Sequence, residues 1–380
     1  MTAPGLFFWQ NMPTHHQAAS LDALAELWPA PVTGVWCSRI SEARRRLGWS
    51  EPATRHLAHR YLPADRPAWK KEVREVIDAH AEDIHVFSGI GAYAPVTHAL
   101  GLLSARPAPK MGLIVEMPVM LGWRRHLRHL KARYHYRRHY GRMGCVLTMG
   151  AAAREYYAQL GFERRRLFPF FYQTEAPAPA PRAAPAVLSL AYVGQINHRK
   201  GLDVLLEALA RVADAGWTLT VYGDGPDRAR AEKFAVSAGL AGRVRFLGSV
   251  PSEEVLRRLP SHDLCIVPSR FDGWGMVVNE AIQSGVPVLV SDRAGSSELL
   301  AASHAGAVFP AGDPRRLAEL IDARLRDRSL LDSERRAAAA FAPRLAPGEA
   351  ARYLRDVLRH VFLGEGDRPA PGWLPPSAAR

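Results

Sequence analysis

Short apolar runs alternate with helical patterns throughout the second half of the chain. Leucines recur at helical spacing within residues 200–216, and polar stretches of helical length separate most of the other runs. Buried strands that alternate with helices are typical of a parallel sheet covered on both faces. The expected strands lie at 188–194, 217–223, 243–248, 263–269, 286–292 and 305–310.

The first half of the chain shows the same alternation less regularly. We therefore predict an α/β protein with two doubly wound Rossmann-like domains that face a cleft. In such sheets ligands bind at the carboxyl ends of the strands, so the loops there are the places to look for chemistry. The expected strands of the first half lie at 5–9, 32–37, 83–90, 110–118, 145–150 and 166–172.

Proline and alanine divide the two halves. The stretch at 174–186 is rich in both and cannot enter a central strand, so we interpret it as a linker. The first domain then spans 1–173 and the second spans 187–346. Residues 347–363 have the pattern of one more helix, which we expect to cross back to the first domain. The proline- and glycine-rich residues 364–380 are expected to form a flexible tail.

Length and composition fit two globular domains. The 380 residues are too many for one comfortable core, and 48% apolar with 23% charged residues is ordinary for a globular protein. No apolar run is long enough to span a bilayer, and the amino terminus lacks the pattern of a signal peptide. We therefore expect a cytoplasmic protein. The formal net charge of +13 predicts an anionic partner: nucleic acid, a phospholipid surface or a phosphorylated substrate.

Metal and redox chemistry are not indicated. Cys37, Cys145 and Cys265 lie far apart without a CxxC pair, which argues against a disulfide framework or a zinc site. No DxD sequence occurs in the chain, so we expect no carboxylate-held divalent cation. The full dinucleotide fingerprint follows none of the predicted strands, which counts against an NAD or FAD enzyme. We predict neither a metal site nor a cofactor.

The densest chemical signal is the segment PSRFDGWGMVVNEAIQSGVPVLVSD at 268–292. A strand, a glycine-bearing loop and a helix that opens near Gly275 would place free backbone N–H groups at the edge of the sheet, where they can bind an anion. Asp272 lies in the loop, and Glu280 follows eight positions later within the helix. The simpler alternative makes Asp272 a helix cap and Glu280 a solvated helix residue; the setting favours a binding role.

This segment resembles the EGFG…E motif of retaining, nucleotide-sugar-dependent glycosyltransferases of the GT-B architecture, the family 4-like "glycosyl transferases group 1". The resemblance implies Asp272 at the donor sugar and Glu280 at the ribose of the nucleotide. Aspartate replaces the more usual glutamate at the first position, so its side chain reaches one methylene less. The resemblance covers nearly the whole second domain through YVGQINHRKGLDVLLEAL (192–209), YGDGP (222–226), RVRFLG (243–248), 268–292 and GSSELL (295–300).

The same resemblance implies a clamp for the diphosphate of the donor. Lys200, at the start of a helix, can pair with the diphosphate. The family usually carries arginine directly after the glycine of this loop, where this chain has Gln195. Glutamine cannot neutralise a phosphate, so the missing charge falls to Arg199, Lys200 or Arg270. The predicted donor-binding residues are Gly194, Gln195, Arg199, Lys200, Gly223, Arg270, Gly273, Trp274, Gly275 and Met276.

The first domain offers weaker candidates. His15 and His16 follow the opening strand, where an acceptor would meet the cleft; a surface position at a helix start explains them equally well. Glu116 ends a predicted central strand, near a position where many members of the family carry histidine. A carboxylate there can bind a sugar hydroxyl or act electrostatically, and we include it among the catalytic candidates with Asp272 and Glu280.

A strongly basic segment lies at 123–142. It contains eight Arg or Lys, four His and no acidic residue. Trp123, Leu127, Leu130 and Tyr134 share one face of the predicted helix. Such a stripe usually faces a core, but the complete absence of acidic residues also predicts contact with an anionic membrane surface or a lipid-diphosphate acceptor.

The resemblance implies a retaining, metal-independent glycosyltransferase of the hexosyltransferase type. Its donor would be a nucleotide-diphosphate sugar and its acceptor a glycan or a lipid-linked glycan, with bacterial surface polysaccharide synthesis as the expected setting. The enzyme would lie at the inner face of the membrane as a peripheral protein. A sugar-nucleotide epimerase of similar architecture is the alternative enzyme. A basic nucleic-acid-binding protein is a third possibility, but no nucleic-acid-binding motif is present, and we expect no nucleic acid partner.

Overall fold

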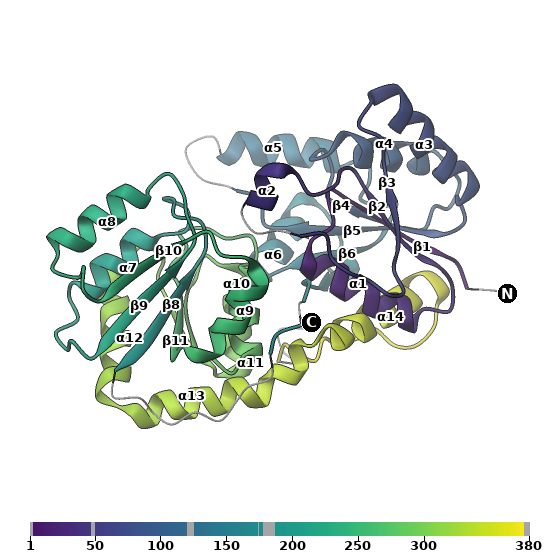
Figure 1. Cartoon of the computed structure of the whole chain (residues 1–380). Helices are drawn as coiled ribbons and strands as arrows, with labels where there is room; N and C mark the ends of the chain where they lie inside the picture. Colours follow the sequence, from purple (N-terminus) through teal and green to yellow (C-terminus); the bar gives the residue numbers. More distant parts are fainter. Residues whose placement is uncertain (1–2, 47–49, 120–124, 174, 178–186, 376–380) are drawn as a thin grey trace.

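The computed structural model describes residues 3–46, 50–119, 125–173, 175–177 and 187–375. Within these residues the chain forms two parallel sheets, each with helices on both faces (Figure 1). The order of strands is β3-β2-β1-β4-β5-β6-β7 in the first sheet and β10-β9-β8-β11-β12-β13 in the second. The predicted fold class, two doubly wound Rossmann-like domains, is confirmed.

The first sheet and its helices occupy the first domain. Its strands are β1 Leu6–Gln10, β2 Val32–Trp36, β3 Ala58–Tyr61, β4 Ile84–Ser88, β5 Met111–Glu116, β6 Met143–Met149 and β7 Leu167–Pro169. Its helices are α1 His15–Leu27, α2 Glu42–Arg46, α3 Arg66–Ala79, α4 Ala94–Ser104, α5 Arg125–Tyr136 and α6 Ala151–Leu160, with the 3-10 turn η1 Arg164–Arg166.

The second sheet begins after the predicted linker. Its strands are β8 Leu188–Val193, β9 Trp217–Tyr222, β10 Val244–Gly248, β11 Leu264–Val267, β12 Val288–Ser291 and β13 Gly306–Phe309. The helices are α7 Leu202–Leu209, α8 Arg228–Ser237, α9 Ser252–Arg258, α10 Met276–Gln283, α11 Leu299–Ser303, α12 Pro314–Arg326, α13 Arg328–Phe341 and α14 Pro347–Leu363. Three 3-10 turns, η2 Leu259–Ser261, η3 Gly295–Glu298 and η4 Ala342–Leu345, complete the described part.

Each sheet has one point at which the order of the strands reverses. In the first sheet β1 pairs with both β2 and β4, and in the second β8 pairs with both β9 and β11. The loops after these strands diverge to opposite faces and leave a crevice between them, which is where doubly wound sheets bind ligands. The strand β3 was not predicted, because its sequence AHRY lacks an apolar run; it pairs only with β2, at the edge of the sheet.

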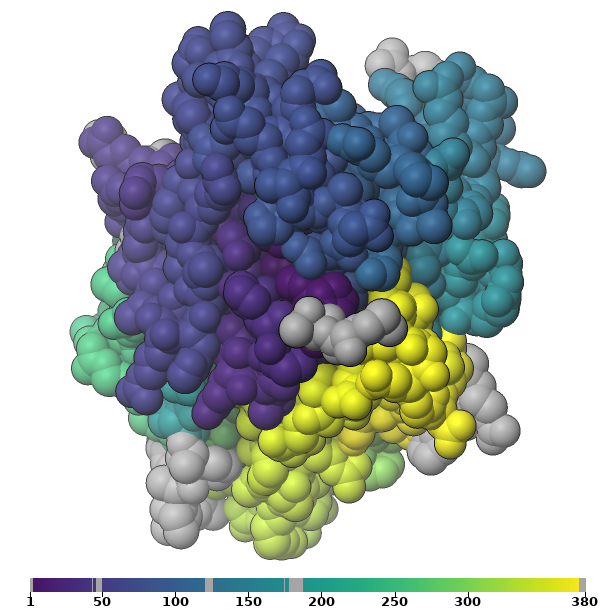
Figure 2. Space-filling view, turned by 90° about the vertical axis from the view of Figure 1, so that its right-hand side faces the viewer, coloured from purple at the N-terminus to yellow at the C-terminus, as the bar shows by residue number. Residues whose placement is uncertain are grey.

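The last helices connect the two domains. Helices α13 and α14 run along the same side of both domains in Figure 1. Helix α14 packs against α1 and β6, and Figure 2 shows the yellow end of the chain beside the purple start. Its buried face includes Leu354, Val357 and Leu358. Most of the predicted linker at 174–186 lies outside the described residues.

The predicted flexible tail at 364–380 is wrong for residues 364–375. Trp373 is 1% exposed and Leu374 is 6% exposed, both within a core cluster that contains side chains of both domains. Arg368 donates hydrogen bonds to the carbonyl oxygens of Arg165 and Leu167. Proline and glycine suggested disorder, but the buried side chains and these hydrogen bonds hold the segment against the protein.

Candidate active site

Two loops of the second domain meet at the point where the order of its strands reverses. One follows β8 and carries Arg199 and Lys200; the other follows β11 and carries Arg270 and Asp272. The backbone N–H of Arg270 donates to the carbonyl oxygen of Arg199 at 2.8 Å. A Cβ atom at Gly201, whose φ is 72°, would lie 2.1 Å from the carbonyl oxygen of Pro268. Only glycine allows the two loops to approach this closely.

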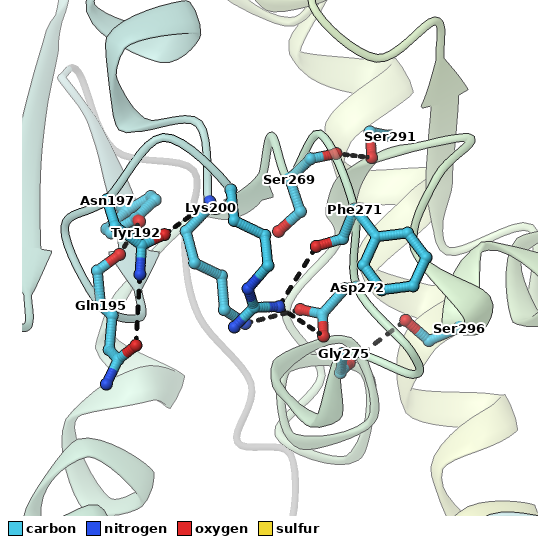
Figure 3. A network of polar contacts seen from close by, with 11 residues as sticks. Tyr192, Gln195, Asn197, Lys200, Ser269, Phe271, Asp272, Gly275, Ser291 and Ser296 are labelled. Atoms are coloured by element: carbon cyan, nitrogen blue, oxygen red, sulfur yellow. Dashed lines mark hydrogen bonds and ion pairs between the residues drawn. The ribbon is translucent and has the colours of Figure 1, made fainter. Parts of the chain in front are cut away.

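Asp272 is the centre of the charged cluster between these loops. Nζ of Lys200 donates to its carboxylate at 2.5 Å, and the guanidinium of Arg199 lies 3.5 Å from the other carboxylate oxygen. Figure 3 shows the Lys200 and Asp272 side chains pointing toward one another. Arg199 also donates to the carbonyl oxygen of Phe271 at 3.2 Å. Two cations thus lie beside this carboxylate, and both can also pair with an anionic ligand.

The glycine loop leads directly into α10. Gly275 is its N-cap at φ 96°, and no side chain caps the helix, so the first N–H groups from Met276 onward can bind an anion. The 3-10 turn η3 is hydrogen-bonded to the loop, and Figure 3 shows the bond between Ser296 and Gly275. Oγ of Ser296 donates to the carbonyl oxygen of Gly275 at 3.1 Å, and the Ser296 backbone N–H donates to that of Trp274 at 2.9 Å. Sequence analysis did not single out Ser296.

Glu280 lies within α10, close to the cluster. Burial raises the pKa of its carboxyl to about 7, and the nearby Lys200 opposes that rise. Its carboxylate makes no hydrogen bond to another residue of the described part of the chain. A carboxylate that is partly desolvated and lacks a partner can accept hydrogen bonds from a ligand, as a ribose-binding residue would.

Glu116 brings the first domain to the same place. It ends β5, and a Cβ atom built on Gly273 would lie 2.4 Å from its carboxylate oxygen Oε2. Burial in the surrounding protein raises the pKa of Glu116, and the charge of Asp272 raises it further, against Lys200 and Arg199. Solvent still reaches the side chain. The structure therefore brings all three predicted catalytic candidates, Asp272, Glu280 and Glu116, to one cleft.

Several predicted donor-binding residues have other partners. Arg270 donates to both carboxylate oxygens of Asp203, at 2.7 and 2.8 Å, so its charge is partly compensated, and its contact with the diphosphate stays a prediction. Gln195 is exposed, and its Oε1 accepts a hydrogen bond from Asn197. A Cβ atom at Gly223 would lie 1.9 Å from the carbonyl oxygen of Gly194, so these two glycines permit close contact between loops.

Trp274 is turned into the protein. It is 3% exposed, and its indole N–H donates to Oδ1 of Asn279 at 3.0 Å. Its ring stacks on Phe171 of the first domain, with centroids 4.5 Å apart. Only the backbone of Trp274 therefore remains for a donor, although its side chain fixes the loop.

His15 and His16 lie in the first turn of α1, at the end of the loop after β1. Nε2 of His15 lies 3.5 Å from Oγ of Ser50. Burial lowers the pKa of His16 to about 4, helped by the charges of His15 and Arg44, so His16 is neutral near pH 7. The charges that lower the pKa of His16 include those of His15 and of Arg44 in α2.

A contact between the domains beside the cleft was not predicted. Arg154 of α6 lies 3.7 Å from Glu298 of η3. Burial raises the pKa of Glu298 to about 7, opposed by Arg154 and by a hydrogen bond from the backbone of Ala151. Glu298 lies within the GSSELL series, but nothing in the sequence indicated that this residue would face the first domain.

The apolar stripe of the basic segment is exposed in α5. Leu127, Leu130 and Tyr134 are 60%, 61% and 51% exposed, so the interpretation of this stripe as a core-facing surface is wrong. The helix instead packs on α6 through other positions, among them Tyr136 and His129. Trp123 and Arg124 lie outside the described residues.

The described residues contain neither a candidate membrane span nor a candidate metal site. No helix there combines the length and apolar character that a membrane span requires. No group of three or more His, Cys, Asp or Glu side chains in the described ranges is arranged to hold a metal ion.

Comparison with known proteins agrees with this geometry. The family model "Glycosyl transferases group 1" matches residues 185–341. The 2-deoxystreptamine glucosyltransferase of Streptomyces kanamyceticus is 38% identical over 101 residues, which cover 26% of each chain. The lipopolysaccharide core biosynthesis glycosyltransferase LpsE of Rhizobium meliloti is 29% identical over 194 residues, covering 49% of this chain and 55% of that protein. The chain thus spans between about a quarter and about half the length of these curated relatives.

Solved structures cover almost the whole chain at low identity. HepE of Anabaena, crystallised in complex with UDP and glucose, has a TM-score of 0.68 and 15% identity over 93% of this chain and 98% of that one. Sucrose-phosphate synthase of Thermosynechococcus elongatus has a TM-score of 0.73 and 17% identity over 95% and 100%. The chain has the GT-B fold, and the greater part of its second domain matches the model of the glycosyl transferases group 1 family.

Proposed function

We propose that this protein transfers a sugar from a nucleotide-diphosphate sugar to a glycan or lipid-linked acceptor. One observation carries the proposal: Glu116 of the first domain reaches the loop with Gly273 and Asp272, beside the cations Lys200 and Arg199. Acidic groups for sugar hydroxyls and cations for a diphosphate therefore lie in one cleft. The second domain matches the model of a glycosyltransferase family, and HepE of Anabaena, which has the same fold, binds UDP and glucose.

The residues would divide the work of transfer between them. The bond between the sugar C1 and the diphosphate oxygen breaks, and a bond forms between C1 and the acceptor hydroxyl oxygen, whose proton passes to the departing diphosphate. Lys200, Arg199 and the N-terminus of α10 would stabilise the departing diphosphate. Asp272 and Glu116 would hold sugar hydroxyls, and Glu280 would hold the ribose. Retention of the donor stereochemistry is part of the proposal, and no protein nucleophile is nominated.

In this proposal the negative charge of the departing diphosphate is stabilised by protein cations, and no metal ion is required. Transfer should therefore continue in excess EDTA at the rate seen with added Mg²⁺. Loss of activity in EDTA, with recovery only on addition of Mg²⁺ or Mn²⁺, would contradict metal independence but not sugar transfer.

A screen of donors tests the function as a whole. UDP-, GDP- and ADP-sugars are compared by thermal shift, because a ligand that binds only the folded state raises its apparent stability. The stabilising donor is then incubated with glycan and lipid-linked acceptors, and transfer of the labelled sugar is expected. Isomerisation of the free donor without transfer would instead indicate an epimerase. Binding of oligonucleotides without binding of any nucleotide sugar would contradict both enzyme functions.

The acceptor is proposed to be presented at an anionic membrane surface that α5 contacts from the cytoplasmic side. Exposed Leu127 and Leu130 would enter the interface, among cations such as Lys131, Arg133 and Arg138. Each Lys or Arg at such a surface contributes on the order of 1 kcal/mol at modest salt. Bacterial surface polysaccharide synthesis suits this arrangement, since relatives of the second domain act in lipopolysaccharide core biosynthesis.

Vesicle sedimentation tests the membrane contact. The wild type should bind anionic vesicles at low salt and neutral vesicles poorly, and added salt should release it. Replacement of Lys131, Arg133 and Arg138 by glutamine should lower binding to anionic vesicles. The matched control places glutamine at Arg211, Arg245 and Arg315, which are exposed on the second domain. Equal losses in the two triple variants would mean that net charge, rather than α5, decides binding.

A further inference from the structure

The segment after α14 returns along the molecule toward the cleft. Gly364 ends the helix in a left-handed conformation, and Arg368 then binds two carbonyl groups at the start of β7 and stacks over Phe168 at 4.1 Å. Five residues further on, Trp373 packs edge-on against Tyr353, ten residues before the end of α14. The tail therefore runs back antiparallel to the helix, and it ends its described part between the two domains.

Trp373 is the first ring of an aromatic series that leads to the active-site loop. Its ring meets Phe171 at a centroid distance of 4.9 Å and an angle of 70°. Phe171 stacks in turn on Trp274, at 4.5 Å and 15°. Trp373, Phe171 and Trp274 are 1%, 0% and 3% exposed. Each ring thus fills the space directly behind the next one.

Trp274 transmits this support to the residues that would bind the donor. It lies between Gly273 and Gly275, and its buried ring anchors this part of the loop. Its indole N–H is bonded to Asn279 of α10, and its carbonyl oxygen accepts from Ser296. A change in the position of the ring therefore moves the backbone on both sides, next to Asp272 and at the N-terminus of α10.

We infer that Trp373 is a positioning residue, which holds the loop of Asp272 and Gly275 in place through Phe171 and Trp274. The inference rests on the proposed function for its catalytic meaning, but the mechanical link is a property of the folded chain alone. Protein interiors are close-packed, so removal of the Trp373 ring leaves a void into which Phe171 can move. Phe171 would then withdraw from Trp274, and the loop would lose the surface against which it rests.

Hydrogen exchange in the ligand-free protein tests the mechanical link. Trp373→Ala should speed exchange of the amides at 270–277, and Trp373→Phe, which retains a ring, should stay near the wild type. Leu325→Ala is the matched control, because Leu325 is 5% exposed in the separate core of the second domain. It should lower the melting temperature without changing exchange at 270–277. Trp373→Leu replaces the alanine variant if that variant does not fold.

Calorimetry with UDP measures the consequence for the site. Coupling through packed networks changes affinity by about 2- to 30-fold, and we expect Trp373→Ala to weaken UDP binding within that range. The double variant Trp373→Ala with Trp274→Phe should bind UDP no more weakly than the weaker of the two single variants, because both act on one contact. Additive losses, or equal changes in Leu325→Ala, would overturn the inference. A wild type that binds no nucleotide counts against the proposed function, while the exchange experiment still decides the role of Trp373.

Discussion

The two walls of the cleft are built differently. On the second domain, the charged residues lie on two loops whose backbones are bonded to one another, with glycines at the points of closest approach. On the first domain, Glu116 lies at the end of β5, and His15 and His16 lie in the first turn of α1. We call these two loops of the second domain, together with α10, the donor wall; hydrogen bonds between the loops hold their shape in the absence of a ligand. The position of Glu116 relative to the donor wall depends on how the two domains pack together. The stacking of Phe171 on Trp274 is one of the contacts that fix this packing.

The largest effect is expected on the donor wall, at Asp272. Asp272→Asn keeps the size of the side chain but removes the charge that Lys200 and Arg199 face. A hydrogen bond to a charged group contributes about 1.5–3 kcal/mol, so kcat/KM should fall roughly ten- to a hundredfold. The control is Asp224→Asn, since Asp224 pairs with Arg228 outside this cluster. Steady-state transfer assays compare the two, and equal rates would remove Asp272 from the site.

At Glu280, also on the donor wall, one substitution should change the stability of the fold and the affinity for UDP in opposite directions. Its pKa of about 7 lies above that of an unfolded glutamate, so the folded protein loses stability as pH rises from about 4.5 to 7. Glu280→Gln escapes this loss and should be more stable than the wild type by about 3 kcal/mol at pH 8, with little difference at pH 4. Denaturant unfolding at both pH values measures it. The same variant should bind UDP more weakly; a variant less stable at pH 8 would contradict the raised pKa.

The donor wall was predictable because its signals are local in sequence. Asp272, Gly275 and Glu280 fall within one strand–loop–helix unit, and the period of apolar residues places that unit at the edge of the sheet. What the sequence could not supply was the partner of each charge. Arg270 had the right chemistry for a phosphate, yet Asp203, 67 positions away, partly compensates it. Periodicity locates a side chain on an element but says nothing of contacts between distant elements.

The same limit explains the errors outside the cleft. The stripe with Leu127 and Leu130 has the spacing of a buried face, but spacing does not reveal whether another element covers it. Composition predicted a flexible tail, but composition averages over the segment and does not show that Trp373 and Leu374 are buried or that Arg368 is hydrogen-bonded to the first domain. Helix α14, by contrast, has a continuous amphipathic pattern, and its range of 347–363 in the structure equals the predicted range.

Smaller losses of UDP affinity are expected for single substitutions at Lys200, Gln195 and Arg270 of the donor wall, and their order shows which side chain binds the diphosphate. Lys200→Ala should weaken UDP binding by about tenfold, because Lys200 carries one of the two cations beside Asp272 and acts on Glu280 as well. Gln195→Ala should change affinity by less than about threefold, since an exposed glutamine supplies no charge. Calorimetry with UDP gives the order. Arg270→Gln is a further control, whose charge Asp203 already partly compensates; a larger loss there, or at Gln195, would mean that the diphosphate binds elsewhere.

The smallest change is expected on the opposite wall, at Glu116. Glu116→Gln should leave UDP affinity unchanged, because its place near Gly273 and Asp272 fits contact with the sugar rather than with the nucleotide. Loss of one hydrogen bond of ordinary strength, about 0.7–1.4 kcal/mol, should lower kcat by about three- to tenfold.

The pH dependence of transfer distinguishes a chemical role for Glu116 from a structural one. Its pKa is raised, so the carboxylate becomes protonated as pH falls at a higher pH than an ordinary glutamate would. If the ionised form holds the sugar or acceptor, kcat of the wild type declines on the acid side, and this decline is reduced in the glutamine variant. Glu280 also titrates near this range, but its effect appears in UDP affinity, which calorimetry measures separately. Parallel acid limbs in the two proteins, with equal kcat at pH 8, would mean that Glu116 only lines the cleft, and that the donor wall alone carries the chemistry.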